Sequence, residues 1–351
     1  MKLGVISLGG KSSRLIMEES KKYFSEVVDI NIKKIDVHAS SKGIIAMYDG
    51  TKLQDFDCVY IRGSHKYSML QRAITESLQH KCYLPIIPSG FTNGHNKYFT
   101  LIELQKKNIP IPQSYVAANI EAAKKILKKA HYPLVIKIPE GTHGKGVLFA
   151  DSIGSAKSIA DSLEIFKQPY IIQEYIETNA TDIRAIVIGN KVMAAMIRKA
   201  EKFENRANIH QGGVGIAHEL DDQAEDIAVR SAMAIGADIC AVDMLESDKV
   251  YVIEVNLSPG LEGITNATNK NIGGMIAEYL FKKAKEYKNS VNNSEISKIL
   301  SDNQDSQEII TNLKIQSGVI KLPSIVSKVS GFKNEEEVSI ISKKGRILIK
   351  R

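Results

Sequence analysis

The sequence is poor in cysteine and has no long apolar run. No apolar stretch approaches the ~18 residues that a membrane-spanning helix needs. The three cysteines, Cys58, Cys82 and Cys240, are odd in number and far apart, which argues against a disulfide framework and predicts reduced thiols in the core. Residues 1–7 begin directly with a strand pattern and lack the features of a signal peptide. We therefore expect a soluble, cytoplasmic protein.

Two common catalytic signatures are also missing. No Ser-His or Cys-His constellation is evident, and the eight histidines show no metal-ligand spacing. The string Gly9-Gly10-Lys11-Ser12 resembles the end of a Walker A motif, but that motif requires glycine where Val5 stands. We therefore expect neither an enzyme nucleophile nor a P-loop.

The positive charge is concentrated at the end of the chain. The composition, with 43% hydrophobic and 25% charged residues among 351, is typical of a globular protein. Residues 312–351 contain nine Lys or Arg and three Glu, so they carry +6 of the formal net charge of +7. The basic character therefore belongs to a tail, whose function needs a separate explanation.

The order of strand and helix patterns predicts an α/β protein built of several parts. Residues 1–90 alternate strands with helices, which is typical of a small domain with a parallel sheet, and a turn-rich joint follows over residues 85–94. Further strands and helices extend over residues 91–285. Residues 286–312 are rich in Asn and Ser and predict a linker with room for a short helix, before a β-rich module at 313–351.

A polar group interrupts two apolar strands expected over residues 241–245 and 250–255. Glu254 and Asn256 are two residues apart and face the same side of a strand, and Asp243 can lie beside them. Two carboxylates and an amide oxygen suit a magnesium ion that carries substrate phosphates. The alternative is an ordinary edge strand with exposed polar residues. It is less favoured because polar groups in so apolar a stretch are costly unless they are paired or liganded.

A lysine and a glycine loop predict phosphate binding. Lys137 lies within an apolar strand, where a buried ammonium group needs an anion. In the loop that follows, Gly141, Gly144 and Gly146 allow backbone amides to approach phosphate oxygens closely. Glycine-rich hairpins are common, so the loop gains its weight from the lysine before it.

Two further groups suit a nucleotide or its substrates. The first is the end of a strand expected over residues 170–176, whose backbone groups and aromatic ring suit contact with an adenine base. It comprises Gln173, Glu174, Tyr175 and Ile176. Taken alone, this segment is better explained as a plain strand end. A cationic set suits phosphate and carboxylate oxygens through bidentate hydrogen bonds, with a solvated face as the alternative; it comprises Arg184, Arg198, Arg206 and the nearby Asn208.

In their order along residues 1–285, these motifs resemble the ATP-grasp superfamily, and within it the RimK-like alpha-L-glutamate ligase family. The most specific string is Glu254-Val255-Asn256-Leu257-Ser258-Pro259-Gly260-Leu261-Glu262-Gly263-Ile264. The supporting strings are residues 136–147, Gln173-Glu174-Tyr175-Ile176, Asp182-Ile183-Arg184, and Arg206-Ala207-Asn208 ahead of Gly212-Gly213. The resemblance implies a pre-ATP-grasp domain over residues 1–90 and two α/β subdomains over residues 91–285 that close on ATP.

The resemblance also implies a role for each matching residue. Lys97 and Lys137 would hold phosphates, and Glu174 and Tyr175 would face adenine. Other implied nucleotide-site residues are Asp182, Arg206 and Asn208, and the implied ligands of two magnesium or manganese ions are Asp243, Glu254 and Asn256. We expect Arg198, Arg206 and Asn208 to be catalytic, and Arg62 and Arg184 to bind substrate. One departure is Gln211, because the family often has Arg just before its Gly-Gly pair.

The reaction implied is ATP-dependent formation of an amide bond. ATP would convert a carboxylate into an acyl phosphate, which an amine then attacks, so that an amino acid, with glutamate favoured, is added to a protein or cofactor acceptor. Two alternatives stay open: an ATP-grasp kinase for a small molecule, and a nucleotide-sensing DNA-binding regulator.

The tail resembles the AbrB/MazE-like (SpoVT-AbrB) swapped-hairpin module. Its strings are Ile320-Lys321-Leu322-Pro323, Val329-Ser330-Gly331-Phe332, Glu336-Glu337-Val338-Ser339-Ile340 and Gly345-Arg346-Ile347-Leu348-Ile349. The resemblance implies an intertwined homo-oligomer, either a dimer or a tetramer. Its basic residues would also suit DNA phosphates. We rank DNA binding through residues 313–351 below dimerisation, because no base-reading element is identifiable.

Overall fold

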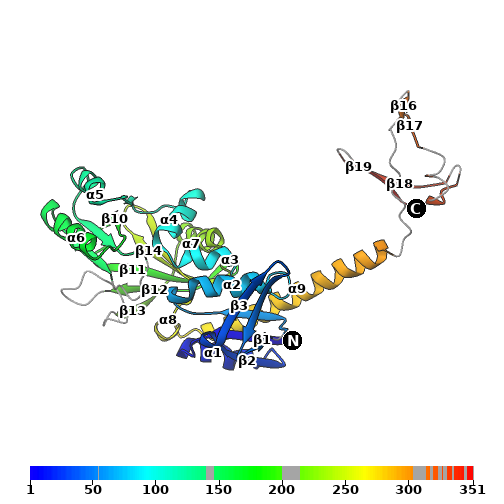
Figure 1. Ribbon diagram of the computed structural model, residues 1–351, viewed down its shortest axis with the longest axis horizontal. Helices are drawn as coiled ribbons and strands as arrows, with labels where there is room; N and C mark the ends of the chain where they lie inside the picture. Colours follow the sequence, from blue (N-terminus) through cyan, green and yellow to red (C-terminus); the bar gives the residue numbers. More distant parts are fainter. Residues whose placement is uncertain are drawn as a thin grey trace. The chain divides into compact units, whose positions relative to one another are not determined.

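The computed structural model describes residues 1–53, 55–139, 146–199 and 214–302, together with the tail segments 314–316, 319–322, 326, 330–333, 336–343 and 346–350. The chain divides into two compact units, Met1–Asn289 and Ser290–Arg351 (Figure 1). The mixed α/β fold class is confirmed. The finer boundary expected at residues 90 and 91 stays a prediction.

The first sheet is parallel, as the alternation of strands and helices predicted. Its order is β2-β1-β6, formed by β1 (Lys2–Ser7), β2 (Glu26–Asn31) and β6 (Cys58–Ile61). Helix α1 (Lys11–Ser20) follows β1, and α2 (Ser68–Leu78) follows β6 and the short helix η2 (His65–Tyr67). The carboxyl ends of two neighbouring parallel strands therefore open at one edge, where α/β sheets commonly bind ligands.

Two local features differ from the sequence prediction. Between β2 and β6 the chain forms a short helix and a separate antiparallel sheet that the sequence analysis missed; these are η1 (Ile32–Lys34), β3 (Ile35–Ser40), β4 (Gly43–Tyr48) and β5 (Thr51–Lys52). The turn-rich joint contains helix α3 (Pro88–Gly94), which Pro88 can begin because the first helical residue needs no N–H partner.

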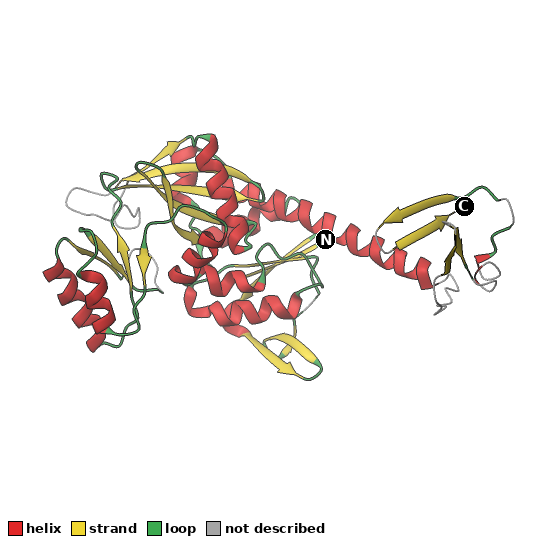
Figure 2. Ribbon diagram, turned by 90° about the horizontal axis from the view of Figure 1, so that it is seen from above, coloured by secondary structure: helices red, strands yellow, loops and turns green. Residues whose placement is uncertain are grey.

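A small four-stranded sheet forms the next layer, in the order β7-β10-β8-β9. Its strands are β7 (Ser114–Tyr115), β8 (Leu134–Lys137), β9 (Val147–Ala150) and β10 (Ile171–Glu174). Helices α5 (Ile120–Leu127) and α6 (Ile153–Ile165) lie beside this sheet (Figures 1 and 2). The helices and the sheet enclose a separate core that includes Leu127, Leu134 and Ala160. Helix α4 (Lys97–Lys106) precedes this part of the chain.

The largest sheet is antiparallel, with the order β13-β12-β11-β14-β15. Its strands are β11 (Thr181–Ile188), β12 (Lys191–Lys199), β13 (Val214–His218), β14 (Ile239–Glu246) and β15 (Val250–Asn256). Strands β11 and β12 pair as a hairpin across Gly189-Asn190. Helices α7 (Asp222–Ile235) and α8 (Glu262–Thr268) contact the strands of this sheet. The apolar residues of β11 and β14 place it in the main core.

The expected linker is largely helical. Helix α9 (Ile272–Asp302) continues through residues for which only a short helix was predicted. Asn and Ser cost only a few tenths of a kcal/mol each in a helix, so a helix that begins on buried Ile272, Ile276 and Leu280 can extend through them. None of the helices in the described part of the chain is long and apolar enough to cross a membrane.

The described parts of the tail form two separate hairpins, as the β-rich pattern predicted. They pair β16 (Lys314–Gln316) with β17 (Val319–Lys321), and β18 (Ser339–Lys343) with β19 (Arg346–Lys350). Both carry exposed apolar side chains; these are Ile315, Val319, Ile320, Ile340, Ile341 and Ile347.

Candidate active site

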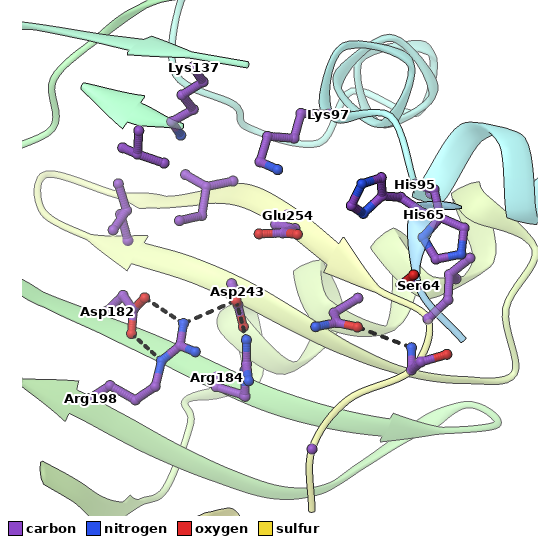
Figure 3. A pocket seen from close by; sticks show the side chains of 18 of the residues that line it. Ser64, His65, His95, Lys97, Lys137, Asp182, Arg184, Arg198, Asp243 and Glu254 are labelled. Atoms are coloured by element: carbon purple, nitrogen blue, oxygen red, sulfur yellow. Dashed lines mark hydrogen bonds and ion pairs between the residues drawn. The ribbon is translucent and has the colours of Figure 1, made fainter. Parts of the chain in front are cut away.

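A cavity of about 670 Å³ lies within the unit Met1–Asn289. Its walls come from the carboxyl ends of β1 and β6, from β8 and β10 of the small sheet, and from β11, β14 and β15 of the large sheet. This volume is in the range of small-molecule and cofactor sites. Figure 3 shows the side chains that converge on it.

The predicted metal ligands line this cavity together. In the antiparallel register of β14 and β15, Asp243 lies opposite Glu254, and Ala241 lies opposite Asn256. Asn256 is two residues from Glu254 on the same strand, so the three side chains form one group, here called the metal trio. The Oδ1 atom of Asn256 accepts a hydrogen bond of 3.0 Å from the backbone N–H of Ser258, which fixes the amide.

Two arginines and two aspartates form a buried ion-paired tetrad beside the trio. The guanidinium of Arg184 donates to both oxygens of Asp243, at 2.7 and 2.6 Å. Arg198 donates to both oxygens of Asp182, at 2.6 and 2.5 Å, and its Nη2 lies 3.0 Å from Asp243. We call Asp182, Arg184, Arg198 and Asp243 the Asp–Arg tetrad (Figure 3).

The sheet register creates the tetrad. Arg184 on β11 lies opposite Asp243 on β14, and Asp182 on β11 lies opposite Arg198 on β12. Burial disfavours the charged form of Asp243, but Arg184 and Arg198 outweigh it and hold the pKa of that carboxyl well below its usual range. Burial raises the pKa of Asp182 even though Arg198 lies beside it. From the sequence, these arginines were expected to contact phosphate or substrate. That role stays a prediction, and in this structure their nearest anions are the two aspartates.

Lys137 has a neutral partner. Its Nζ donates to Oε1 of Gln173 at 2.6 Å, and Nε2 of Gln173 in turn donates to Oγ of Ser114 at 2.7 Å. Removal from water lowers the pKa of Lys137 to about 8, against the opposing attraction of Glu254. The ammonium group therefore has no anion bonded to it among the described residues. The buried side chain of Gln173 orients the lysine.

Other predicted nucleotide residues lie at the same cavity. Lys97 begins α4, where the side chain of Asn96 accepts from the N–H groups of Tyr98 and Phe99 and fixes the start of the helix. Glu174, Tyr175 and Ile176 also line this cavity. The N–H groups of Glu174 and Tyr175 already donate to Gln113 and Pro133, so contacts of these two residues with a base are left to carbonyls and side chains.

The far end of the cavity was largely missed from the sequence. It is formed by residues between Ser7 and His95 that include Gly10, Lys11, Ser12, Arg62, Ser64 and His65. Of these, only Arg62 was expected to bind substrate. The string Gly9-Gly10-Lys11-Ser12, which does not fit a P-loop, connects β1 to α1 at this end. Polar residues directly after the first parallel strand were the signal that could have identified it.

Several predicted residues lie outside the part of the chain that the structure describes. They are Gly141, Gly144, Arg206, Asn208 and Gln211. Gly146 lies within the described residues. Its φ is +77°, and its carbonyl accepts a hydrogen bond from the N–H of Ile138. The expected roles of the other five stay predictions.

The chemistry of the metal trio fits a hard divalent cation. Two carboxylates and one amide supply oxygen ligands only. Magnesium prefers oxygen ligands, and in enzymes it is usually bound by one or two carboxylates together with substrate phosphates. Among the described residues, no three His, Cys, Asp or Glu side chains converge as a metal cluster, so a metal at the trio depends on the Asn256 amide and on substrate oxygens. Both oxygens of Asp243 already accept a hydrogen bond from Arg184, so a metal at the trio would bind their remaining lone pairs.

Comparison with known proteins places the cavity in context. Residues 94–280 match the family described as RimK-like ATP-grasp domain. A probable alpha-L-glutamate ligase of Cellvibrio japonicus is 33% identical over 293 residues, covering 81% of this chain and 97% of the relative. A probable alpha-L-glutamate ligase of Legionella pneumophila strain Corby is 38% identical over 251 residues, covering 70% of this chain and 83% of the relative.

A solved structure shows the same fold. The ATP-grasp ligase PsnB, complexed with a variant of its minimal precursor, Mg and ADP, superposes with a TM-score of 0.60 at 20% identity, covering 80% of this chain and 97% of that one. Nearly the whole length of the Cellvibrio relative is matched by 81% of this chain. About a fifth of this chain therefore lies outside that match.

Proposed function

The chain belongs to the RimK-like ATP-grasp family and is an ATP-dependent carboxylate–amine ligase, and on that premise we propose that it attaches glutamate to a protein or cofactor acceptor. The choice of glutamate is supported by the Cellvibrio and Legionella relatives, which are named probable alpha-L-glutamate ligases.

One observation carries the proposed chemistry: a trio of oxygen ligands shares a cavity with two lysines. Asp243, Glu254 and Asn256 come from β14 and β15, Lys137 comes from β8 of the small sheet, and Lys97 begins α4 (Figure 3). Anionic and cationic walls of this kind suit a magnesium–triphosphate group, which needs carboxylates for the metal and ammonium groups for phosphate oxygens.

Each residue of the site takes a role in this proposal. Lys97 and Lys137 hold phosphate oxygens, and the Gln173–Lys137 hydrogen bond keeps the second lysine aimed at them. The segment from Gln173 to Ile176 faces the adenine, and the proposed nucleotide contacts also include Asp182, Arg206 and Asn208. Bound at the metal trio, one or two Mg²⁺ or Mn²⁺ ions would neutralise charge on the transferring phosphoryl group.

The reaction joins a carboxylate to an amine without an enzyme nucleophile. A carboxylate oxygen of the substrate attacks the γ-phosphorus of ATP and releases ADP, and the acyl phosphate that results has phosphate as a leaving group. The amine then attacks the acyl carbon, phosphate departs, and the amine loses a proton. Arg184 and Arg62 are proposed to hold substrate oxygens during these steps. Arg198 is proposed to act by fixing Asp182 and Asp243.

A direct test combines ADP release with mass spectrometry. The protein is incubated with ATP, magnesium, each of the twenty amino acids, and a panel of peptide and small-molecule carboxylate acceptors. A gain of one glutamyl residue on an acceptor supports the proposal. A phosphorylated product with no amide would instead identify a kinase.

The tail supports a second proposal, that this unit forms a homo-oligomer. An isolated two-stranded hairpin is marginal in water, and both described hairpins expose isoleucines. Contact with the same surfaces of another copy would cover them. Light scattering of the Ile340→Asp and Ile341→Asp double variant tests this, since a lower mass is expected than for wild type. A gel-shift assay with duplex DNA tests the lower-ranked role of the basic residues 313–351.

A further inference from the structure

The two ends of the cavity differ in charge. The part formed by residues between Ser7 and His95, here called the N-terminal pocket end, contains Lys11 and Arg62 and no acidic residue among those described. The acidic lining residues all lie elsewhere in the chain; they are Glu174, Asp182, Asp243, Glu254 and Glu262. Of these, Glu262 is 3.2 Å from the Nζ of Lys11. The N-terminal pocket end is therefore a cationic region beside an acidic one.

Arg62 is a buried cation with neutral partners. Its side chain is 4% exposed and donates to Oγ of Ser13 at 3.2 Å, to the hydroxyl of Tyr60 at 3.1 Å and to the carbonyl of Pro259 at 2.7 Å. None of these partners carries a negative charge. A buried charge that has only neutral partners is unfavourable, and an anion bound beside it would relieve this. Three bonded donors leave two further N–H groups of the guanidinium.

Two buried side-chain nitrogens that follow Arg62 in the chain lack hydrogen-bond partners. Of the described residues, only four have a buried side-chain nitrogen or oxygen without a hydrogen bond, and two of them are here: Nδ1 of His65 and Nε2 of Gln71. His65 lines the cavity, and Gln71 is fully buried with its Oε1 bonded to Nε2 of His95, another lining residue. Figure 3 shows His65 and His95 close to Ser64 at one end of the pocket. An amide nitrogen can only donate, so it calls for an acceptor.

The start of α1 adds donors of the same kind. The N-cap residue is Gly10, which provides no side-chain cap, and the first turn of this ten-residue helix contains no acid. Gly10, Lys11 and Ser12 all line the cavity. The first N–H groups of a helix carry partial positive charge and favour an anion.

We propose that the N-terminal pocket end binds a carboxylate group of the ligase substrate, through Arg62, the start of α1 and the ring of His65. This inference rests on the proposed function, because it assigns the substrate end of the same cavity whose other walls serve the nucleotide. A carboxylate accepts hydrogen bonds and carries one negative charge, so it matches a region of donors and cations. The carboxylate belongs either to the amino acid or to the acceptor.

The test uses a matched pair of substitutions at Gly10. Its φ of −65° is ordinary for any residue, and no atom lies within 4 Å of an added Cβ. Gly10→Asp and Gly10→Asn both provide a good N-cap and have nearly the same shape, so they differ in charge and little else. The aspartate would place a carboxylate in the proposed site and compete with the substrate. We expect KM for one carboxylate substrate to be about tenfold higher in Gly10→Asp than in Gly10→Asn, with KM for ATP equal in both.

The KM values of the two Gly10 variants either assign the site to one substrate or overturn the inference. A higher KM for the amino acid assigns the site to the amino acid, and a higher KM for the acceptor assigns it to the acceptor. Equal KM values for both substrates, or a rise confined to ATP, would overturn the inference. This comparison does not depend on glutamate being the substrate. Every carboxylate–amine ligase has a carboxylate substrate, so Gly10→Asp and Gly10→Asn can be compared with whichever substrate supports ADP release. If mass spectrometry shows that glutamate is not added, the proposed function fails while this comparison still stands.

Discussion

At the large sheet each charge of the Asp–Arg tetrad faces an opposite charge, whereas at the N-terminal pocket end Arg62 faces only neutral oxygens. Sheet register explains the first region, because β11 carries Asp182 and Arg184 between the matching positions of β12 and β14. The second region has two buried side-chain nitrogens without hydrogen-bond partners, Nδ1 of His65 and Nε2 of Gln71. The difference indicates that the protein itself orders the Asp–Arg tetrad, whereas the N-terminal pocket end is proposed to be satisfied by a ligand.

The largest effect is expected at the metal trio, from Glu254→Gln. The change keeps the size of the side chain and removes the carboxylate whose charge a metal needs, so ADP release should fall by about 1000-fold or more. The matched control is Glu246→Gln, which lies on β14 outside the cavity and should keep its activity. A manganese-binding titration should show weaker binding in Glu254→Gln alone. Full turnover in this variant would contradict the metal assignment.

Breaking the tetrad should lower stability strongly. Asp182→Asn leaves the buried guanidinium of Arg198 with Asp243 as its only charged partner, and should reduce the free energy of unfolding by about 3 kcal/mol. Asp226→Asn breaks an exposed pair with Arg230 and should reduce it by less than about 1 kcal/mol. Urea denaturation measures both. Equal losses would mean that burial does not distinguish these pairs.

The affinity for nucleotide should fall as pH rises above about 8, the pKa of Lys137. Burial lowers this pKa, so the ammonium group loses its proton above this value and no longer attracts phosphate oxygens. A bound phosphate favours the charged form, so the fall is expected in the binding of ATP to the free enzyme. We expect about tenfold weaker binding at pH 9 than at pH 7. Calorimetry with a non-hydrolysable ATP analogue measures it. Lys137→Arg stays charged and should remove most of this dependence. A fall of the same size in that variant would assign the titration to another group.

The smallest effect is expected from Gln71→Met. Nε2 of Gln71 has no partner and only Oε1 is bonded, so the free energy of unfolding should change by less than about 1 kcal/mol. Gln173→Met, at a side chain with both amide atoms bonded, should lower it by about 2 kcal/mol. Thermal and urea unfolding of the two variants compare the loss of a fully hydrogen-bonded amide with the loss of a partly bonded one. A larger loss for Gln71→Met would show that its amide nitrogen is bonded in solution.

The sequence predicted the features that depend on local spacing. Alternation along a strand was enough to place Glu254 and Asn256 on one face, and Asp243 falls opposite Glu254 as expected. The three cysteines are buried and unpaired, as predicted, and burial raises the pKa of each thiol.

Features that depend on pairing between distant segments were not predicted. The partner of Arg184 is 59 residues away, and only the register of β11 with β14 brings them together. The neutral partner of Lys137 depends in the same way on the pairing of β8 with β10. Helix α9 extended further than its composition suggested, because the packing of its first turns outweighs weak local preferences.

We propose that this chain forms an amide between glutamate and an acceptor at the expense of ATP. Mass spectrometry of the products tests it most directly, with wild-type protein and Glu254→Gln compared in parallel in the presence of ATP, magnesium, glutamate and the acceptor panel. We predict a mass gain of one glutamyl residue with stoichiometric ADP in the wild type and neither in the variant. ADP formation with a phosphorylated product, or equal product from both proteins, would contradict the account.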